Sequence, residues 1–245
     1  MQHREYKEIQ SGADTAVLLI HGIAGTPNHF RPFLPLIPQD CTVWNLLLKG
    51  HGGSVRDFSR ASMEQWEDQV RQAVEELAQT HSRIFLAAHS MGTLFAIEQA
   101  IREPKIRGLF LLAVPLRLKL RLRLAGNCIK VFFGRIRPED VTARAAKDCY
   151  GIARDYNLLH YLGWIPRYLE LFGKIRRTRE LLPALNTPAL AFQSAGDEMV
   201  SVKSAQELKK CPSLSVRVLP RSGHYYYAER DREELLAAFR EFVAQ

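Results

Sequence analysis

Three polar side chains each follow a short apolar run of the kind that forms a buried strand. Ser90 lies in an Ala-His-Ser-Met-Gly sequence at residues 88–92, and Asp197 and His224 follow the last two apolar runs. A serine hydroxyl is a weak nucleophile until a neighbouring base takes its proton. The order serine, aspartate, histidine, with each residue at the carboxyl end of a different strand, predicts a nucleophile, an acid and a base gathered at one edge of a sheet.

The surroundings of Ser90 have the composition of a sharp strand-to-helix turn. Small residues at positions 88 and 92 let a strained backbone lift the hydroxyl into the open. The plainer interpretation is that Ser90 only caps the helix that begins there. A second small-residue turn, His-Gly-Ile-Ala-Gly at residues 21–25, follows the first apolar run, and its backbone N–H groups could face a developing oxyanion.

The remaining pattern is one of strands alternating with helices. Helices are expected between residues 62 and 79, where Ser62 and Gln65 form a capping box, from residue 90 onward, and over residues 229–243. Apolar runs at 16–20 and 42–48 predict parallel strands buried on both faces, and further strands are expected at 83–88, 106–114, 188–194 and 214–219. This alternation predicts an α/β fold, with a mostly parallel sheet and helices on both of its faces.

Together these segments resemble the α/β-hydrolase superfamily, and within it the small bacterial carboxylesterases and monoacylglycerol-lipase-like serine hydrolases. The resemblance spans residues 16–224 and includes Lys-Gly-His-Gly at 49–52 and Gly-Asp-Glu-Met-Val at 196–200. It implies that Ser90 is the nucleophile, His224 the general base and Asp197 the residue that orients it. It also implies that the backbone N–H groups of Ile23 and Met91 form the oxyanion hole.

Two positions depart from the family pattern. Ala88 replaces the first glycine of the usual Gly-x-Ser-x-Gly sequence, and Thr93 stands where many relatives have a second glycine. Neither residue belongs to the reacting groups. We expect the small-residue requirement to be met and the helix packing behind Ser90 to differ.

The activity implied by the resemblance is hydrolysis of a small-molecule carboxylic ester through an acyl-enzyme, as in a carboxylesterase or a monoacylglycerol-lipase-like enzyme. Thioesterases, peptidases and perhydrolases share the same triad, so they remain alternatives, as does a non-catalytic binding module on the same fold. Serine at position 90 disfavours haloalkane dehalogenation and epoxide hydrolysis, which in this fold use an aspartate nucleophile. Acyl chain length, alcohol group and oligomeric state stay open.

An arginine-rich stretch at residues 117–182 interrupts the strand-helix rhythm. It predicts a basic, mostly helical cap inserted in an α/β-hydrolase core made of residues 1–116 and 183–245. The stretch holds 15 Lys+Arg and 6 Asp+Glu, whereas the rest of the chain holds 19 and 20, so the net charge of +8 belongs to the cap. Residues 117–124 alternate as a strand would, but the family resemblance favours a helix.

Two interpretations of this charge remain. The simpler one is a solvated face on which arginine stems cover apolar neighbours. The sharper one is weak contact of the cap with anionic lipid, because the segment also carries leucines, Phe132, Phe133 and Trp164. No recognition motif accompanies the charge, so nucleic acid is not an expected partner.

Other classes of site find little support in the 245 residues. There is no H-E-x-x-H sequence, no Cys/His cluster and no G-x-G-x-x-G after a strand, so no metal and no cofactor are expected. Histidines 21, 51 and 89 are interpreted as structural. The four cysteines (41, 128, 149 and 211) are expected to be buried free thiols, and the absence of a leader or of an 18-residue apolar run favours a cytoplasmic location.

Overall fold

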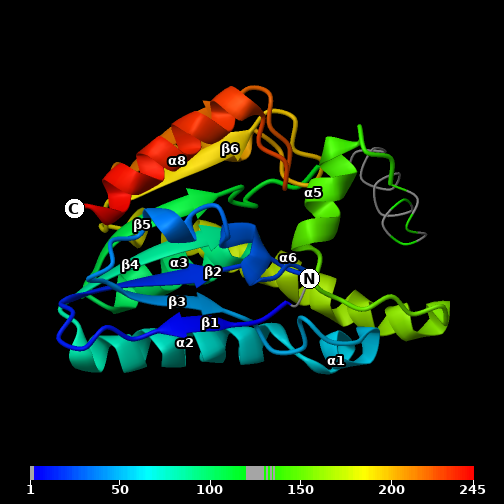
Figure 1. Cartoon of the computed structure of the whole chain (residues 1–245), viewed down its shortest axis with the longest axis horizontal. Helices are drawn as coiled ribbons and strands as arrows, with labels where there is room; N and C mark the ends of the chain where they lie inside the picture. The colour runs from blue at the N-terminus through cyan, green and yellow to red at the C-terminus, as the bar shows by residue number, and fades with distance from the viewer. Residues whose placement is uncertain (1–2, 120–129, 131, 133, 135) are drawn as a thin grey trace.

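The computed structural model describes residues 3–119, 130, 132, 134 and 136–245 (Figure 1). In this part of the chain a seven-stranded sheet forms from β1 (Tyr6–Glu8), β2 (Thr15–Ile20), β3 (Thr42–Leu46), β4 (Arg83–His89), β5 (Ile106–Leu112), β6 (Ala189–Ser194) and β7 (Leu214–Leu219). The spatial order is β1-β3-β2-β4-β5-β6-β7, and every pair is parallel except β1 with β3. The mostly parallel sheet expected from the apolar runs is present.

Helices cover both faces of the sheet, as Figure 1 shows for α2 (Met63–Thr80) and α8 (Glu229–Val243) on opposite sides. Leu18 and Ile20 pack in the cluster that contains α2 and α3 (Met91–Arg102), whereas Val17 and Leu19 pack in the cluster that contains α8. Successive side chains of a strand point to opposite faces, so a strand covered on both faces is apolar throughout. This is why β2 reads as an unbroken apolar run.

The structure differs from the sequence expectations at several element ends. Strand β5 ends at Leu112 because Ala113 takes a positive φ of 54°, which breaks the extended backbone. At the start of α2 the Ser62 side chain accepts the N–H of Gln65, but the reciprocal bond of a full capping box is not formed. The complete box belongs to α1 (Val55–Arg60), which begins after Ser54. Strand β1 and the short helices α1 and α7 (Ser204–Leu208) were not predicted.

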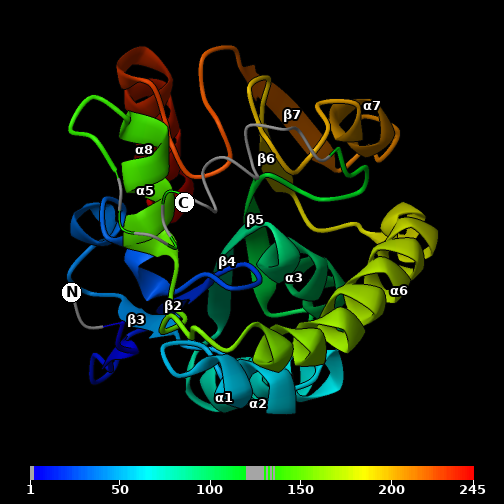
Figure 2. The ribbon, with the colours of Figure 1, turned by 90° about the vertical axis from the view of Figure 1, so that its right-hand side faces the viewer.

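The described part of the 117–182 stretch is mostly helical from residue 141 onward, with a break at residues 150–157. It contains α5 (Val141–Cys149), the 3-10 helix η3 (Leu158–Trp164) and α6 (Ile165–Leu181), followed by η4 (Leu182–Ala184). Figure 2 looks onto the end of the sheet where these helices lie. Helix α6 contacts α2 and α3, and α5 contacts the 3-10 helix η1 (Pro27–Phe30), so both pack against the sheet domain.

The helix expected from residue 117 does not begin there. Leu118 forms an antiparallel bridge with Val200, flanked by a 2.7 Å bond from the Ser201 N–H to the Arg117 oxygen and a 2.8 Å bond from the Lys119 N–H to the Met199 oxygen. These backbone groups are paired across to the loop after β6, so they cannot make helical bonds. The rest of the predicted helix, residues 120–124, lies outside the described residues.

A buried ionic cluster joins α6 to the helices beneath it. The Lys174 ammonium donates to Glu98 of α3 at 2.6 Å and to Glu67 of α2 at 2.7 Å. Lys174 and Glu98 are almost completely buried. Burial raises the pKa of Glu98, and the nearby ammonium offsets only part of that rise. Buried charges persist only when they are paired, so this cluster fixes α6 in one place.

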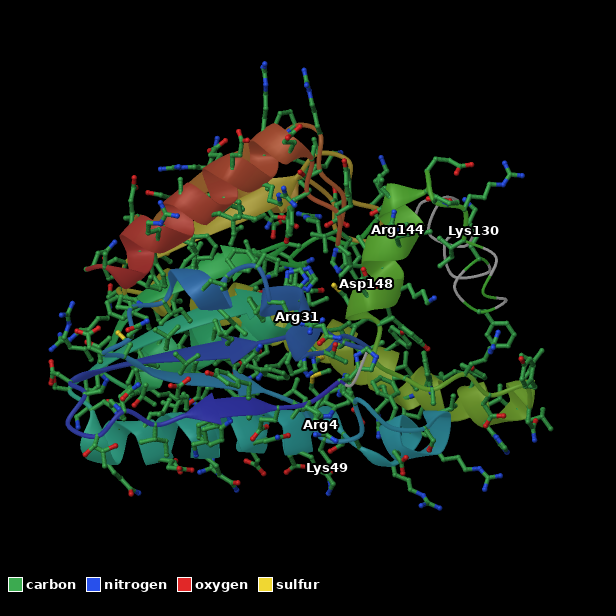
Figure 3. All side chains as sticks on the ribbon, in the orientation of Figure 1. Arg4, Arg31, Lys49, Lys130, Arg144 and Asp148 are labelled. Carbon is green, nitrogen blue, oxygen red and sulfur yellow. The ribbon has the colours of Figure 1, made fainter. Side chains whose placement is uncertain are left out.

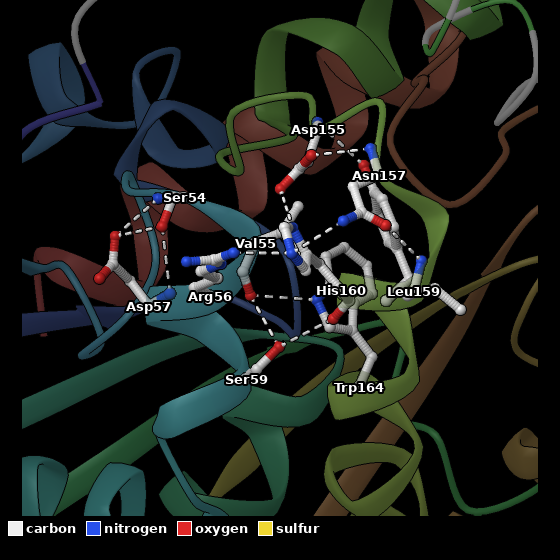
Figure 4. A network of polar contacts seen from close by, with 11 residues as sticks. Ser54, Val55, Arg56, Asp57, Ser59, Asp155, Asn157, Leu159, His160 and Trp164 are labelled. Atoms are coloured by element: carbon white, nitrogen blue, oxygen red, sulfur yellow. Dashed lines mark hydrogen bonds and ion pairs between the residues drawn. The ribbon is translucent and has the colours of Figure 1, made fainter.

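A second polar network holds η3 against α1 (Figure 4). His160 Nδ1–H donates to Asp155 at 2.6 Å, and its Nε2 accepts from Arg56 of α1 at 2.8 Å and from Asn157 at 3.1 Å. Trp164 belongs to the same contact, because its ring packs 4.8 Å from Phe58 and its Nε1–H donates to a backbone oxygen of α1. Trp164 therefore faces the core and is not one of the exposed apolar residues of this stretch.

Cys41, Cys149 and Cys211 are buried free thiols, as predicted, while Cys128 and Phe133 lie outside the described residues. Among the helices of residues 3–119 and 136–245, none is both long and apolar enough to cross a bilayer. Within the same residues there is no group of three or more His, Cys, Asp or Glu side chains placed to hold a metal ion.

Candidate active site

Ser90 occupies the turn between β4 and α3 in a strained conformation, with φ of 51° and ψ of −123°. Such a backbone persists only when its surroundings hold it. The Ser90 N–H donates to the Leu112 oxygen at 2.8 Å, and its carbonyl accepts from the Thr93 N–H at 2.9 Å and the Thr93 hydroxyl at 2.6 Å. Thr93, the departure from the family pattern, thus helps to hold the turn.

Two glycines allow the end of β2 to touch this turn. A Cβ atom at Gly92 would lie 2.4 Å from the Ile20 carbonyl oxygen, and one at Gly22 would lie 2.8 Å from Ser90 Cβ. Real Cβ atoms do not approach so closely, and the atom met at Gly92 is backbone, which cannot swing away. Gly92 and Gly22 therefore bring the turn at residues 21–25 directly against Ser90.

Asp197 and His224 come together as the sequence predicted. His224 Nδ1–H donates to Asp197 Oδ2 at 2.8 Å, and Asp197 Oδ1 accepts the N–H groups of Met199 and Val200 at 2.8 and 2.7 Å. Both side chains are buried. In the neutral ring, a proton on Nδ1 for this bond makes Nε2 the acceptor.

The Nε2 atom of His224 is buried and has no hydrogen-bond partner among the described residues. Ser90 is near, because the ring of His89, the residue before it, lies 4.7 Å from the His224 ring. The Ser90 hydroxyl and His224 Nε2 are not hydrogen-bonded to each other in this structure. Such a contact commonly tightens only when substrate binds.

The two predicted oxyanion donors flank Ser90. The amide of Met91 opens α3, so it has no acceptor within the helix. In the turn at 21–25, the Ala24 N–H is taken by His51 Nε2 at 3.1 Å and the Gly25 N–H by the Gly22 oxygen at 3.0 Å. The N–H of Ile23, the residue before Ala24, has no acceptor among the described residues.

His21 and His51 clamp this turn to the loop after β3. The His21 Nε2 accepts the Leu48 N–H at 3.0 Å, and its Nδ1–H donates to the Gly22 oxygen at 2.8 Å. Burial lowers the pKa of His21 to about 4 and the pKa of His51 well below its usual value. Both rings are therefore neutral near pH 7, which they must be in order to accept backbone N–H groups. These bonds agree with the structural interpretation of the two histidines.

Two further residues of the site were not singled out from the sequence. Glu198 is buried beside Asp197, and its Oε2 accepts the backbone N–H of His224 at 3.0 Å. His29 stacks on His89 with ring centroids 3.9 Å apart, and its pKa is lowered to about 3, chiefly by burial. Glu198 lies within a quoted family sequence, but His29 has no motif around it, so only the fold reveals it.

A pocket of about 350 Å³ is lined in part by His29, Cys149, Tyr225 and Tyr227. None of Ser90, Asp197 and His224 lines it, so we do not assign the reacting groups to it. Burial raises the pKa of the Cys149 thiol to about 12, which keeps it protonated and removes it as a rival nucleophile.

Comparison with known proteins agrees with this geometry. Residues 17–238 match the family model described as the alpha/beta hydrolase family. The chain belongs to that family. The predicted α/β-hydrolase fold and the predicted likeness to lipases and esterases of this fold are thereby confirmed.

The relatives of this hydrolase include lipolytic enzymes. This chain is 26% identical over 201 residues to a thermostable monoacylglycerol lipase of Bacillus sp. (strain H-257). The match covers 81% of this chain and 67% of that protein. A solved structure from work on LipS and LipT, two metagenome-derived lipolytic enzymes, has a TM-score of 0.75 at 19% identity, covering 99% of this chain and 98% of that one. The monoacylglycerol lipase of Paleococcus ferrophilus has a TM-score of 0.69 at 18% identity, covering 98% and 99%. The structural likenesses at this identity show the fold alone.

Proposed function

We propose that this hydrolase cleaves carboxylic esters with Ser90 as nucleophile, His224 as general base and Asp197 as the orienting acid. The proposal rests above all on the buried Asp197–His224 hydrogen bond, which leaves His224 Nε2 as a base without a partner among the described residues. The strained turn at Ser90 supports it, because a sharp strand-to-helix turn at the carboxyl edge of the sheet is where this fold places a nucleophilic serine.

The proposed reaction has two steps. His224 Nε2 takes the proton of Ser90, whose oxygen attacks the ester carbonyl, and the resulting oxyanion accepts the N–H groups of Ile23 and Met91. The C–O bond to the alcohol then breaks, and His224 gives the proton to the departing alcohol. A water deprotonated by His224 next attacks the acyl-enzyme. The bond between the acyl carbon and Ser90 Oγ breaks, His224 returns its proton to Ser90, and the carboxylic acid leaves. The charge of Asp197 stabilises the imidazolium formed in each step.

Active-site labelling tests this assignment. A fluorophosphonate should modify the wild-type protein covalently, and Ser90→Ala should abolish that modification. Ser82→Ala is the matched control, because this exposed serine hydrogen-bonds to Asp14 and to no other described residue, and it precedes the opposite end of β4. A folded wild-type protein that is not labelled would contradict the proposal and favour a non-catalytic binding module.

For the substrate class we propose monoacylglycerols or similar single-chain esters, because named relatives are monoacylglycerol lipases. Thioesters, peptides and peracid formation use the same triad, so only rates can separate them. Nitrophenyl esters of increasing chain length, together with a monoacylglycerol and a matched thioester, should give the highest kcat/KM for a long-chain oxygen ester. A maximum at short chains would favour a carboxylesterase, and a preference for the thioester would contradict the assignment.

We also propose that the cap, residues 117–182, touches anionic lipid. Seven large side chains in or just before η3 and α6 are more than half exposed, and we call them the apolar stripe: Tyr156, Leu158, Leu159, Leu162, Ile165, Leu169 and Phe172. A contiguous exposed apolar face of this kind usually marks a contact surface.

The charges around the apolar stripe support an anionic partner. Arg154 lies over the ring of Tyr156, and Arg176 follows Phe172 by four residues and makes no ion pair with a described residue. Glu170 is turned away, because it accepts the Met63 N–H and pairs with Arg167. Arg144 lies on α5, and Lys130, which pairs with Asp140, lies close to α5 at the same end of the molecule (Figure 3). An apolar face bordered by cations suits the surface of an anionic bilayer.

Vesicle co-sedimentation of the Ser90→Ala protein tests this contact without hydrolysis. Binding should be stronger to phosphatidylglycerol-containing vesicles than to pure phosphatidylcholine, and Leu162→Glu should weaken it about fivefold. Ile9→Glu is the matched control, because Ile9 is equally exposed but lies outside the apolar stripe. Equal binding to both vesicles would contradict the proposal, and so would a Leu162→Glu change that alters only self-association in size-exclusion chromatography.

A further inference from the structure

The peptide group of His224 is held from both sides by buried side chains that the proposed reaction does not use. Its N–H donates to Glu198 Oε2 at 3.0 Å, and its carbonyl oxygen accepts from His89 Nε2–H at 3.0 Å. Glu198 is 5% exposed and His89 is 1% exposed. Glu198 follows Asp197 directly and His89 precedes Ser90 directly, so each contact ties the base to a neighbour of another triad residue.

This support matters because His224 lies on a loop. Between β7 and α8 the chain has no helix or strand to fix its backbone, and its buried N–H and C=O groups need partners from elsewhere. A carboxylate is a stronger acceptor for an N–H than a neutral carbonyl is. The nearby bonds of Ser222 to Asp231 and of Gly223 to Tyr226 hold the loop, but neither reaches His224 itself.

The packing of Gly223 shows how closely Glu198 approaches the loop. A Cβ atom at Gly223 would lie 3.1 Å from Glu198 Oε2 and 3.2 Å from Oε1. Both distances are shorter than ordinary contacts, so a side chain at position 223 would displace the carboxylate by a few tenths of an ångström. The absence of a side chain at position 223 is therefore what lets Glu198 reach the N–H of the next residue.

His89 is suited to its side of the contact. Burial, the first of several causes, lowers its pKa well below the usual value, so the ring is neutral. Its bond to a carbonyl oxygen requires the proton on Nε2. Stacking on His29 fixes the plane of the ring and hence the direction of that N–H.

We propose that Glu198 is a positioning residue, which together with His89 sets where the His224 ring lies between Ser90 and Asp197. This inference rests on the proposed function, since it concerns the placement of the general base. Catalytic groups must be held within about 0.5 Å of their productive geometry, and a 1 Å displacement can lower the rate about 10²-fold. The effect should therefore fall on kcat and leave KM nearly unchanged.

Steady-state kinetics on a soluble nitrophenyl ester separates positioning from a general loss of structure. Glu198→Ala should lower kcat about 10- to 100-fold with KM changed less than about twofold. Glu198→Gln keeps an oxygen acceptor for the His224 N–H and should stay within about threefold of wild type. Glu103→Ala is the control, because this carboxylate also accepts a backbone N–H, from Lys105, but lies at the opposite end of α3 from Ser90. Wild-type kcat in Glu198→Ala, or equal damage in Glu198→Gln, would overturn the proposal.

Gly223→Ala gives an independent test that leaves the carboxylate in place. It should lower kcat in the same way as Glu198→Ala, and the double variant should be no worse than Glu198→Ala alone, because both changes break one contact. Thermal unfolding shows which variants are folded. Losses that multiply in the double variant would overturn the proposal.

Ser90→Ala measured beside these variants keeps the two proposals apart. If Ser90→Ala still hydrolyses the ester at the wild-type rate, the proposed function is wrong. If Ser90→Ala is inactive while Glu198→Ala matches wild type, the proposed function stands and the positioning role is wrong.

Discussion

One edge of the sheet carries the proposed triad, and we call it the catalytic edge. Polar side chains are buried there, whereas apolar side chains are exposed along η3 and α6. At the edge, His21, His51 and Glu198 are buried, and each accepts a backbone N–H. Along η3 and α6, leucines and aromatic rings are exposed while the polar Lys174 is buried. At the edge, therefore, the need to bind backbone N–H groups limits which residue types fit. The outer face of η3 and α6 has no such constraint from the described backbone.

Breaking the junction between the two regions should have the largest effect. Lys174→Met removes the cation between Glu98 and Glu67 and leaves the buried Glu98 carboxylate with only the longer, 3.7 Å contact to Arg177. Loss of one partner of a buried ion pair typically destabilises by about 3–5 kcal/mol. Urea unfolding measures the change. Arg176→Met, two residues along α6 at an exposed position, should change stability by less than about 0.5 kcal/mol, and equal effects of the two variants would contradict the importance of the cluster.

The next largest effect is expected from Gly92→Ala at the catalytic edge. The added Cβ would meet the Ile20 carbonyl oxygen at 2.4 Å, where the backbone of β2 cannot yield. We expect the free energy of unfolding to fall by about 3 kcal/mol, the upper end of the range for overpacking, and the proposed esterase activity to be lost. A Gly92→Ala variant with wild-type stability and activity would show that the end of β2 and the turn at Ser90 are not rigidly packed together.

Acid should weaken the catalytic edge through its buried histidines. The pKa of His21 is about 4 and that of His29 about 3 in the folded protein, against about 6.5 when unfolded. Below pH 6.5 these histidines bind protons in the unfolded chain but not in the folded one. The free energy of unfolding therefore falls as the pH decreases toward the pKa values of the folded state. Each such histidine contributes a slope of at most about 1.4 kcal/mol per pH unit.

Unfolding midpoints in urea at pH 7, 6 and 5 measure that slope. His29→Phe keeps a ring against His89 but cannot titrate, so its stability should depend less steeply on pH than that of wild type. Identical slopes would mean that His29 takes up a proton equally in both states.

The smallest effect is expected on the cap. A methyl group added at Gly173, inside α6, would have no atom of the described residues within 4 Å apart from its own helix backbone and chain neighbours, so Gly173→Ala meets open space. Alanine in a helix interior should raise stability by about 0.5–1 kcal/mol, which urea unfolding measures. The same substitution thus has opposite signs at Gly92 and Gly173, and a destabilising Gly173→Ala would show that the cap surface is as constrained as the edge.

Most of the sheet could be predicted because its central strands are buried on both faces. Six apolar runs correspond to β2 through β7, and the residues of the proposed triad follow three of them. Strand β1 could not be predicted in this way, since all three of its residues are exposed and polar or aromatic and its pairing with β3 depends on the fold. Leu118 was assigned wrongly for the same reason, because its partner Val200 is 82 positions away along the chain.

The candidate site was predictable only where a motif carries it. Ser90, Asp197 and His224 lie at strand ends within recognisable sequences, whereas Glu198 and His29 act through backbone and ring contacts that no spacing encodes. Glu198 contacts His224, and His29 contacts His89, so each depends on a partner that is distant along the chain. Site residues of this second kind become visible only in three dimensions.

The outer strand β1 has a consequence for behaviour at high concentration. It is only three residues long, runs against the direction of the other strands and carries Lys7 and Glu8. Short, charged edge strands offer a poor template for another chain, because a growing ladder needs a long row of free N–H and C=O groups. On this side the sheet is thus protected from edge-to-edge aggregation, even where the chain is crowded during synthesis.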